Sequence, residues 1–388
     1  MRKIAANYIF PVSRPPIKNG IIVVDDNGCI LEVRDTGGKL REEPGLEFYN
    51  GVIVPGFVNS HSHLEYSYVK NLIPQGGGLV EFIKAIVNIK ANVVAEERKM
   101  IEADEEMYFE GIVAVGDHSN TLAPKDIKKN SRIDYHSFVE IYTGLSDVVN
   151  PKADFEIAKA ILASFEGKGS IVPHAPYSLT SEHFEIIAEY AHKNNAIISV
   201  HNQETESERD MFLYGKGTMY DFMVGDGQPP FEIGSPSLEW MLKFFKTNHN
   251  ILLIHNTYTP EDDLVWAENE NPNLYWVLCP GSNLYIENKL PDAPMFAKYG
   301  VKVALGTDSF ASNTRLSILR EMKILQDAYE IDFETLLLWA TLNGAKALNK
   351  QYLYGSLDRG KCPGVLLLEN FDIEHKKIGD QTRVMRII

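Results

Sequence analysis

The feature that most constrains the fold is a series of short apolar runs separated by longer helix-like stretches. Segments such as 181–194 and 317–330 have the helix-like pattern. Continuous apolar strands interleaved with helices predict a parallel sheet covered on both faces. With a first strand at 53–58 the count is eight, which predicts an α/β fold of the (β/α)8 TIM-barrel type. The other seven expected strands are 111–117, 137–142, 169–175, 196–202, 250–256, 274–280 and 302–308.

The two ends of the chain have a different pattern. Residues 1–55 and the part from about 350 onward are short β-branched and apolar runs separated by turn signals such as Asn19-Gly20 and Asn27-Gly28. We therefore expect a small β-sandwich domain built from 1–55 and 350–388, beside a barrel domain formed by 56–349. A length of 388 residues suits one large domain and one small domain.

Composition narrows the class of partner and the compartment. The net charge is -15, which repels phosphate backbones, so we expect a small-molecule substrate and no nucleic acid. No window approaches the ~20 apolar residues that cross a bilayer, and the N-terminus lacks a signal-peptide apolar run. The 3 cysteines are distant from one another and odd in number, so no disulfide framework can be read from them, which fits a reducing compartment. These features predict a cytoplasmic protein without a membrane partner.

Ionisable side chains recur at the carboxyl ends of the predicted strands. In a barrel these ends converge on one mouth, where active sites lie. Since residues i and i+2 of a strand point the same way, His61 and His63 can reach one ion together. Independent core histidines have no reason to gather at one end of a barrel, so the pattern predicts a metal site. The residues at these ends are His61, His63, His174, His201, His255 and Asp308.

The remaining histidines are less informative. His118 follows a strand, and the sequence leaves open whether it reaches the pocket or only the core. His183, His192 and His375 lie in helix-like or terminal segments and are expected at the surface.

The motifs VPGFVNSHSHLE, VPHAPYSLT, SVHNQETESE, LIHNT and ALGTDSFASN, in this order, resemble the amidohydrolase superfamily. The resemblance covers essentially the whole chain and is closest to the cytosine-deaminase-like and chlorohydrolase-like branch. Within that branch, His63-Leu64-Glu65 followed by Tyr66-Ser67 resembles aminofutalosine deaminases, whereas other adenosine-type and guanine deaminases usually differ at this motif. The chain as a whole is therefore nearest to aminofutalosine deaminases and adenosine-type deaminases.

The resemblance implies a single-metal site. Its ligands would be His61, His63, His201 and Asp308. Binuclear members use a carboxylated lysine, commonly at the end of strand four, where this chain has His174. Three imidazoles and one carboxylate suit Zn²⁺, with Fe²⁺ or Ni²⁺ as alternatives.

The implied chemistry is hydrolytic deamination of an aminopurine nucleoside-like substrate of the aminofutalosine, adenosine or S-adenosylhomocysteine type. The ion lowers the pKa of its bound water toward ~7, so that hydroxide attacks and ammonia is released. Asp308 accepts the proton from that water, and His255 polarises the water. Glu204 carries protons to the ring nitrogen and to the leaving ammonia.

Candidate substrate contacts are His174, Glu81 and Ser309. A carboxylate on the substrate would need a cation, and Arg209, Arg315 and Lys289 are not distinguished by the sequence.

Two other functions stay open. A chlorohydrolase or a cyclic amide hydrolase would use the same site, because only the pocket differs. A non-catalytic binding relative is the minor alternative, although such proteins usually lose ligands. The cytidine-deaminase type is excluded because it needs a Pro-Cys-x-x-Cys pair that this chain lacks. Relatives that dimerise leave a homodimer open.

Overall fold

The computed structural model describes residues 1–143, 149–165, 169–245 and 249–388. Its centre consists of two four-stranded parallel sheets. The first sheet contains, in order, β6 (Phe57–Ser62), β7 (Ile112–Ser119), β8 (Asp134–Ile141) and β9 (Gly169–Pro173). The second contains β10 (Ile198–Asn202), β11 (Ile251–His255), β12 (Leu274–Leu278) and β13 (Val303–Leu305). The predicted mixed α/β fold with parallel strands is confirmed.

Backbone hydrogen bonds join the two sheets at both edges. The amide of His201, on β10, donates to the carbonyl of His174 after β9, at 2.9 Å. On the other side, the amides of Thr307 and Asp308 after β13 both donate to the carbonyl of His61 on β6, at 3.1 Å each. The carboxyl ends of first and last strands therefore lie side by side.

One buried apolar cluster unites both sheets. Each of seven strands contributes to it, and the contributing side chains have no or almost no exposed surface, as expected for strands covered on both faces. They are Val58, Ala114, Phe138, Val172, Leu252, Val277 and Ala304.

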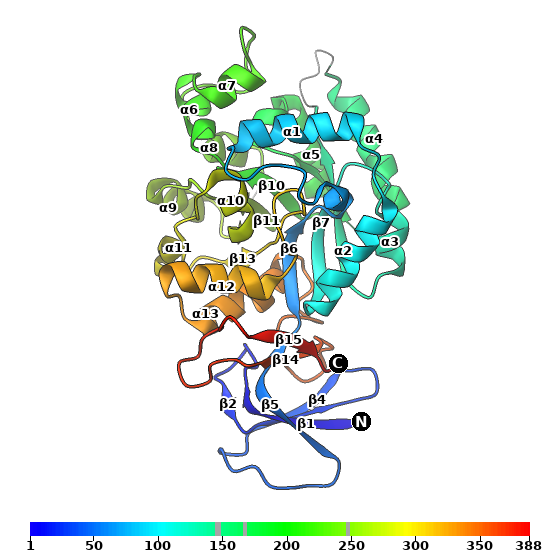
Figure 1. The fold of residues 1–388 in the computed structure, drawn as a ribbon. Coiled ribbons are helices and arrows are strands. Elements are labelled where there is room, and N and C mark those ends of the chain that lie inside the picture. The colour runs from blue at the N-terminus through cyan, green and yellow to red at the C-terminus, as the bar shows by residue number, and fades with distance from the viewer. Residues whose placement is uncertain (144–148, 166–168, 246–248) are drawn as a thin grey trace.

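Helices surround these strands (Figure 1). The helix α1 runs across the end of the molecule that lies farthest from the terminal sheet. The α-helices are α1 (Leu79–Asn92), α2 (Glu97–Phe109), α3 (Lys125–Asn130), α4 (Pro151–Ser164), α5 (Ser181–Asn194), α6 (Glu206–Tyr214), α7 (Thr218–Met223), α8 (Ser237–Leu242), α9 (Glu261–Glu270), α10 (Pro280–Glu287), α11 (Ala293–Tyr299), α12 (Ile318–Tyr329), α13 (Phe333–Leu338) and α14 (Gly344–Ala347). The short turns are η1 (Leu64–Val69), η2 (Pro176–Ser178) and the π-helical η3 (Trp339–Asn343).

Both ends of the chain build one seven-stranded sheet. Its order is β15 (Arg383–Arg386), β14 (Val365–Glu369), β5 (Leu46–Pro55), β1 (Arg2–Ile9), β3 (Ile21–Val24) and β4 (Ile30–Arg34), and β2 (Ile17–Lys18) pairs with β1. The sandwich arrangement and the domain boundaries at 55 and 350 stay predictions.

The expected strand at 53–58 is wrong as a single element. The strand β5 ends at Pro55 and β6 begins at Phe57, with Gly56 between them. The amide of Gly56 donates to the carbonyl of Pro363 at 3.0 Å. A Cβ atom at position 56 would lie 2.3 Å from Val113 Cγ1 and 2.5 Å from that carbonyl oxygen. This close approach separates the terminal strand from the central one.

The structure contains a disulfide that could not be read from the sequence. Cys29 and Cys362 form a disulfide across 333 residues of sequence, and Cys279 is free and buried. They meet because the amide of Ile30 donates to the carbonyl of Lys361 at 2.8 Å, a pairing that sequence spacing does not reveal. Because two of the cysteines are paired, they no longer indicate a reducing compartment, and the cytoplasmic location stays a prediction. Among the described residues, no helix has the length and apolarity needed to span a bilayer.

The surface prediction for His183 is also wrong. Its ring is buried between α4 and α5, where Nε2 donates to Asp154 Oδ2 at 3.1 Å and Nδ1 lies 2.9 Å from Thr180 Oγ1. Thr180 caps the same helix, whereas Asp154 comes from α4, a separate helix 29 residues earlier in the chain. His192 and His375 are exposed, as predicted.

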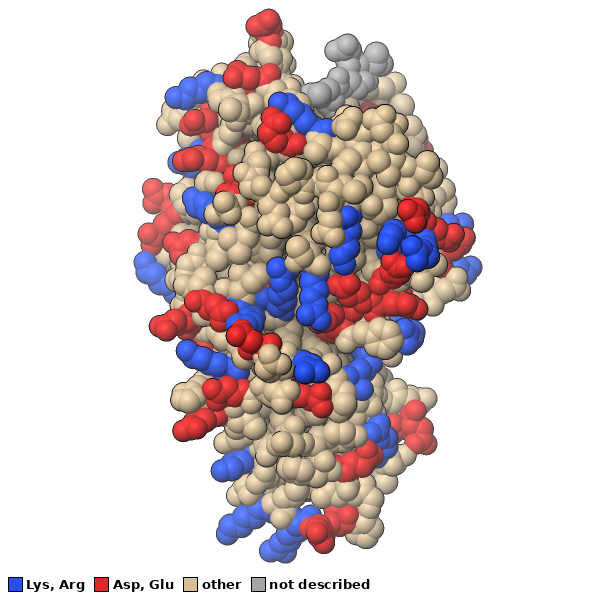
Figure 2. All heavy atoms as spheres, in the orientation of Figure 1, with Lys and Arg blue, Asp and Glu red and all other residues tan. Residues whose placement is uncertain are grey.

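Charges of both signs are spread over the face drawn in Figure 2. Acidic and basic side chains alternate over the helices and over the terminal sheet, so the net charge of -15 is not concentrated in one place on this face.

The junction at Gly56 yields a stability prediction. Gly56→Ala should lower the free energy of unfolding by about 1–3 kcal/mol, because the added methyl group overpacks a site closed by backbone and by Val113. Denaturant unfolding measures this change. Gly379→Ala is the control, since its nearest atom, Thr382 Oγ1, would be 3.7 Å from the new Cβ. Equal midpoints for both variants would show that the junction is not tight.

Candidate metal centre and pocket

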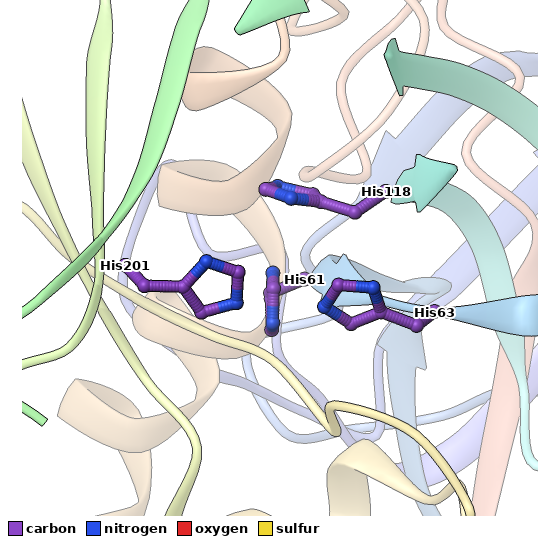
Figure 3. Close-up of side chains that lie close together, drawn as sticks. All are labelled: His61, His63, His118 and His201. Atoms are coloured by element: carbon purple, nitrogen blue, oxygen red, sulfur yellow. The ribbon is translucent and has the colours of Figure 1, made fainter. Parts of the chain in front are cut away.

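Four histidine rings point toward one another at the carboxyl ends of the strands (Figure 3). They are His61 on β6, His63 directly after it, His118 on β7 and His201 on β10. The ring centroid of His61 lies 4.9 Å from that of His63, 4.6 Å from that of His118 and 5.1 Å from that of His201. The ligand atoms of these four residues all lie within 4.8 Å of one another.

Asp308 completes this group. Its Oδ1 lies 3.5 Å from His61 Nε2 and 3.8 Å from His63 Nε2. Its Oδ2 accepts hydrogen bonds from the hydroxyls of Ser282 and Ser312, so the carboxylate is held with one oxygen facing the histidines. The residue has φ 56°, which is uncommon outside glycine and typical of functional sites. The structure thus brings together all four residues that the sequence predicts as ligands.

Whether a metal ion fits among the histidines depends on which ring nitrogens already have hydrogen-bond partners. Both ring nitrogens of His61 and Nδ1 of His63 are buried without a hydrogen-bond partner among the described residues. Such orphaned groups are costly in a protein interior unless something pairs with them. His201 donates from Nδ1 to the carbonyl of His174 at 2.8 Å, which leaves Nε2 with a free lone pair. This donor set fits a divalent cation.

His118 differs from its three neighbours, because both of its ring nitrogens are already occupied. Nδ1 donates to Glu140 Oε1 at 2.7 Å, and Nε2 accepts from the hydroxyl of Ser199 at 2.8 Å. The ring therefore packs among the other histidines without offering a lone pair. Sequence reasoning left His118 open, and it missed Glu140, whose only signal was its place near the end of an apolar strand.

Burial sets the protonation of the group. Burial lowers the pKa of His61, His63 and His118 well below the usual value, so these rings are neutral, which is the form that binds metal. Burial alone would raise the pKa of Asp308, but the nearby imidazoles of His61 and His63 hold it well below its usual range. A carboxylate therefore faces neutral imidazoles.

Glu204 and His255 form the other side of the site. His255 Nε2 lies 3.5 Å from Glu204 Oε1. Asn283 Nδ2 donates to His255 Nδ1 at 3.3 Å, which places the ring proton on Nε2. Burial, reinforced by the charge of Asp308, raises the pKa of Glu204 well above its usual value, whereas burial lowers the pKa of His255 to about 3. The site thus places a carboxyl group whose pKa is raised beside an imidazole whose pKa is lowered.

A buried ion pair holds the His63 segment in place. Asp117 on β7 accepts from the amide of Leu64 at 2.8 Å and pairs with Lys128 Nζ at 2.5 Å. Glu65 accepts from the amides of Asn120 and Thr121 at 3.1 and 3.0 Å, and so ties η1 to the segment after β7. Sequence reasoning missed this support, because its partners lie about fifty residues apart along the chain.

These groups line a pocket that opens to solvent. One wall is apolar and comes from α1 and α7, whereas the floor carries the ionisable residues described above. The apolar wall contains Leu79, Phe82, Ile83, Ile86, Val87 and Met223.

Two of the three candidate substrate contacts, His174 and Ser309, line this pocket. Glu81 is not part of the lining. Its exposed carboxylate pairs with Lys84 at 2.8 Å, and its role in substrate binding stays a prediction.

The three candidate cations are engaged outside the pocket. Arg209 pairs with Asp263, Arg315 pairs with Glu110, and Lys289 lies over the ring of Tyr258. Lys90 is the basic residue among the described lining residues.

The buried ion pair yields a second prediction. Lys128→Met should lower the free energy of unfolding by about 3–5 kcal/mol, because Asp117 then remains buried without a cation. Lys350→Met is the control, since Lys350 pairs with the partly exposed Asp134 at 2.7 Å and should cost about 1 kcal/mol or less. Both are read from denaturant unfolding. A loss for Lys128→Met no larger than that of the control would contradict this account.

Comparisons with known proteins agree with this geometry. An adenosine deaminase of Helicobacter pylori is 24% identical over 353 residues, covering 84% of this chain and 82% of the relative. Among solved structures, Helicobacter pylori aminofutalosine deaminase in complex with methylthio-coformycin has a TM-score of 0.80 at 22% identity, covering 95% of this chain and 92% of that one. The atrazine chlorohydrolase TrzN from Arthrobacter aurescens TC1, complexed with zinc, has a TM-score of 0.76 at 16% identity, covering 98% and 90%.

The model of the amidohydrolase family matches residues 52–376. This span includes all of the strands that carry the site. The chain belongs to the amidohydrolase family and is a hydrolase that acts on carbon–nitrogen bonds.

Proposed function

We propose that this protein is a metal-dependent hydrolytic deaminase of an aminopurine nucleoside-like substrate, of the aminofutalosine, adenosine or S-adenosylhomocysteine type. The observation that carries the proposal is the buried Glu204, whose Oε1 lies 3.5 Å from His255 Nε2 beside a histidine–aspartate cluster and whose pKa is raised by burial. Deamination of a purine ring needs a proton donor at the ring nitrogen next to the attacked carbon. The adenosine deaminase and the aminofutalosine deaminase to which the chain is similar support this substrate class.

The proposed ligands of one divalent ion are His61, His63, His201 and Asp308. Three imidazoles and one carboxylate favour Zn²⁺, and zinc is present in the similar chlorohydrolase structure, with Fe²⁺ and Ni²⁺ as alternatives. When bound, the ion would lower the pKa of a coordinated water toward ~7.

The residues of the chain move the protons. Asp308, which is ionised and held by two serine hydroxyls, accepts the proton of the attacking water. Glu204, which is protonated, donates to the ring nitrogen. The new C–O bond forms as the ring nitrogen gains this proton, and the C–N bond then breaks. Glu204 relays the proton that lets the amine leave as ammonia, and His255 stabilises the oxygen adduct through its Nε2 proton.

The arrangement of the two central sheets is also part of the proposal. We propose that the two four-stranded sheets close into one (β/α)8 barrel, because hydrogen bonds join them at both edges and one apolar cluster unites them. The small terminal sheet would then lie beside the barrel as a separate unit.

A chlorohydrolase or a cyclic amide hydrolase is the second candidate. The similarity to an atrazine chlorohydrolase favours it, and protonation by Glu204 would also assist the departure of chloride from a ring. A non-catalytic relative is the minor alternative.

Metal removal distinguishes ligands from supporting residues. The purified protein should contain one metal ion per chain, and His61→Asn should abolish binding. His118→Asn should only weaken the affinity about 10–100-fold, because His118 supports the ligands without a free lone pair. Elemental analysis and chelator competition measure both. Equal loss in the two variants would make His118 a ligand, and metal-free parent protein would revive the non-catalytic relative.

A substrate panel tests the reaction. Ammonia release from adenosine, S-adenosylhomocysteine and aminofutalosine is expected, without chloride release from chlorotriazines or ring opening of cyclic amides. Turnover of only the latter two classes would replace the proposal by the second candidate.

Glu204→Gln tests the proton donor. The variant should keep its metal and lose about 10²–10⁴-fold in kcat. Because the protonated form is active and its pKa is raised, kcat/KM of the parent should fall on the alkaline side as Glu204 ionises. Full turnover of a metal-loaded Glu204→Gln protein would exclude the role.

A further inference from the structure

Among the described residues, three carboxylates line the pocket, and one of them has no role in the proposed reaction. Glu204 and Asp308 are the proposed proton carriers. The third is Glu140, near the end of β8, whose side chain is only 1% exposed. Its register partner on β9 is Val172, so its carboxylate lies close to the level at which β9 ends and His174 begins.

The Glu140 carboxylate has fewer hydrogen bonds than a buried charge requires. Among the described residues it accepts one hydrogen bond, from His118 Nδ1 at 2.7 Å. His201 Nδ1 is 3.5 Å away, but its proton goes to the carbonyl of His174. Oε2 of Glu140 has no hydrogen-bond partner among the described residues. An ionised carboxylate has about four acceptor positions, and burying it with one donor is costly.

Two other buried carboxylates each accept more hydrogen bonds than Glu140 does. Glu65, which is not in the pocket lining, accepts from two amides and from the Thr121 hydroxyl. Glu321, also outside the lining, accepts from the amide of Gly281 and from the side chain of Asn313. Glu140, which lines the pocket, thus has fewer donors than these two carboxylates outside the lining. A molecule bound in the pocket, whether water or substrate, can supply the missing donors.

The position of Glu140 selects which part of the substrate supplies the donors. Glu204, His255 and Asp308 come from the β10–β13 sheet, whereas Glu140 comes from the β6–β9 sheet. A ring whose reacting carbon lies between Asp308 and Glu204 presents another part of the molecule to Glu140. The α1 side chains that line the pocket are apolar except for Lys90, so this wall offers few partners for hydroxyl groups. Glu81, which the sequence predicted as a substrate contact, is outside the pocket lining and forms an exposed pair with Lys84.

We propose that Glu140 is a specificity-determining residue, which accepts hydrogen bonds from the sugar hydroxyls of the substrate through its unpartnered oxygen. This inference rests on the proposed deaminase function. His118 holds the other oxygen and thereby fixes the orientation of the carboxylate. The selectivity of the enzyme would then be for nucleosides with free hydroxyls over their deoxy analogues.

The test compares Glu140→Gln with the parent on adenosine and on 2′-deoxy, 3′-deoxy and 2′,3′-dideoxy analogues. The glutamine keeps an acceptor for His118 but replaces one acceptor oxygen by a donor. We expect kcat/KM for adenosine to fall about 10–100-fold, mainly through KM, as for loss of a charge-assisted hydrogen bond. Activity on the dideoxy analogue should stay unchanged. Glu321→Gln is the matched control, since it alters a buried carboxyl outside the pocket and should not discriminate between these substrates.

Three results would overturn the inference. An equal loss on all analogues would show that Glu140 acts through His118 and His201 instead of on the substrate. A second metal ion per parent chain that Glu140→Gln removes would make Glu140 a ligand, because Glu140, His174 and His201 offer ligand atoms within 4.8 Å. An unchanged preference for adenosine over the dideoxy analogue would exclude any contact. If the parent deaminates no nucleoside and binds none by calorimetry, the proposed function fails and the inference falls with it.

Discussion

The two hydrogen bonds that the carbonyl of His61 accepts hold both the fold and the site together. They come from the amides of Thr307 and Asp308 and join the first central strand to the segment after the last one. Because the same backbone segments carry His61 and Asp308, the contact that joins the sheets also sets a carboxylate 3.5 Å from an imidazole. The backbone geometry of this junction therefore also sets the geometry of the candidate metal centre.

Burial at this junction shifts the pKa values of the titratable groups. The direction of each shift depends on the partners that the group has. The pKa of Asp308 is lowered beside imidazoles, whereas the pKa of Glu204, which lacks a cation within the described structure, is raised. The pKa values of two carboxyl groups in one pocket are thus shifted in opposite directions, as general acid–base chemistry near neutral pH requires. Two residues at strand ends, His255 and Asp308, take positive φ values to reach these positions.

The support around the centre explains why two charged residues are buried beneath it. Asp117 and Lys128 form an ion pair that provides an acceptor for the amide after His63, where the β6 ladder has already ended. A buried pair of this kind adds little stability over apolar packing. Its value here is positional, since it fixes the backbone that presents a proposed ligand.

Much of this arrangement could be predicted from the sequence. The strand count, the parallel order and the convergence of His61, His63, His201 and Asp308 follow from apolar periodicity and from residue type at strand ends. The junction at Gly56 was missed because its cause is a close approach to Val113 and Pro363, which are distant in sequence. The disulfide and the burial of His183 were missed for the same reason.

By itself the sequence determined which residues stand at the strand ends, because a strand's period and its neighbours in the chain are local properties. Only the tertiary structure decided which of them have free lone pairs. His61 and His118 are both histidines at strand ends, yet Glu140 and Ser199 occupy the nitrogens of one and nothing in the described structure occupies those of the other. Hydrogen-bond satisfaction depends on partners from other strands, so it is fixed only when the strands are assembled.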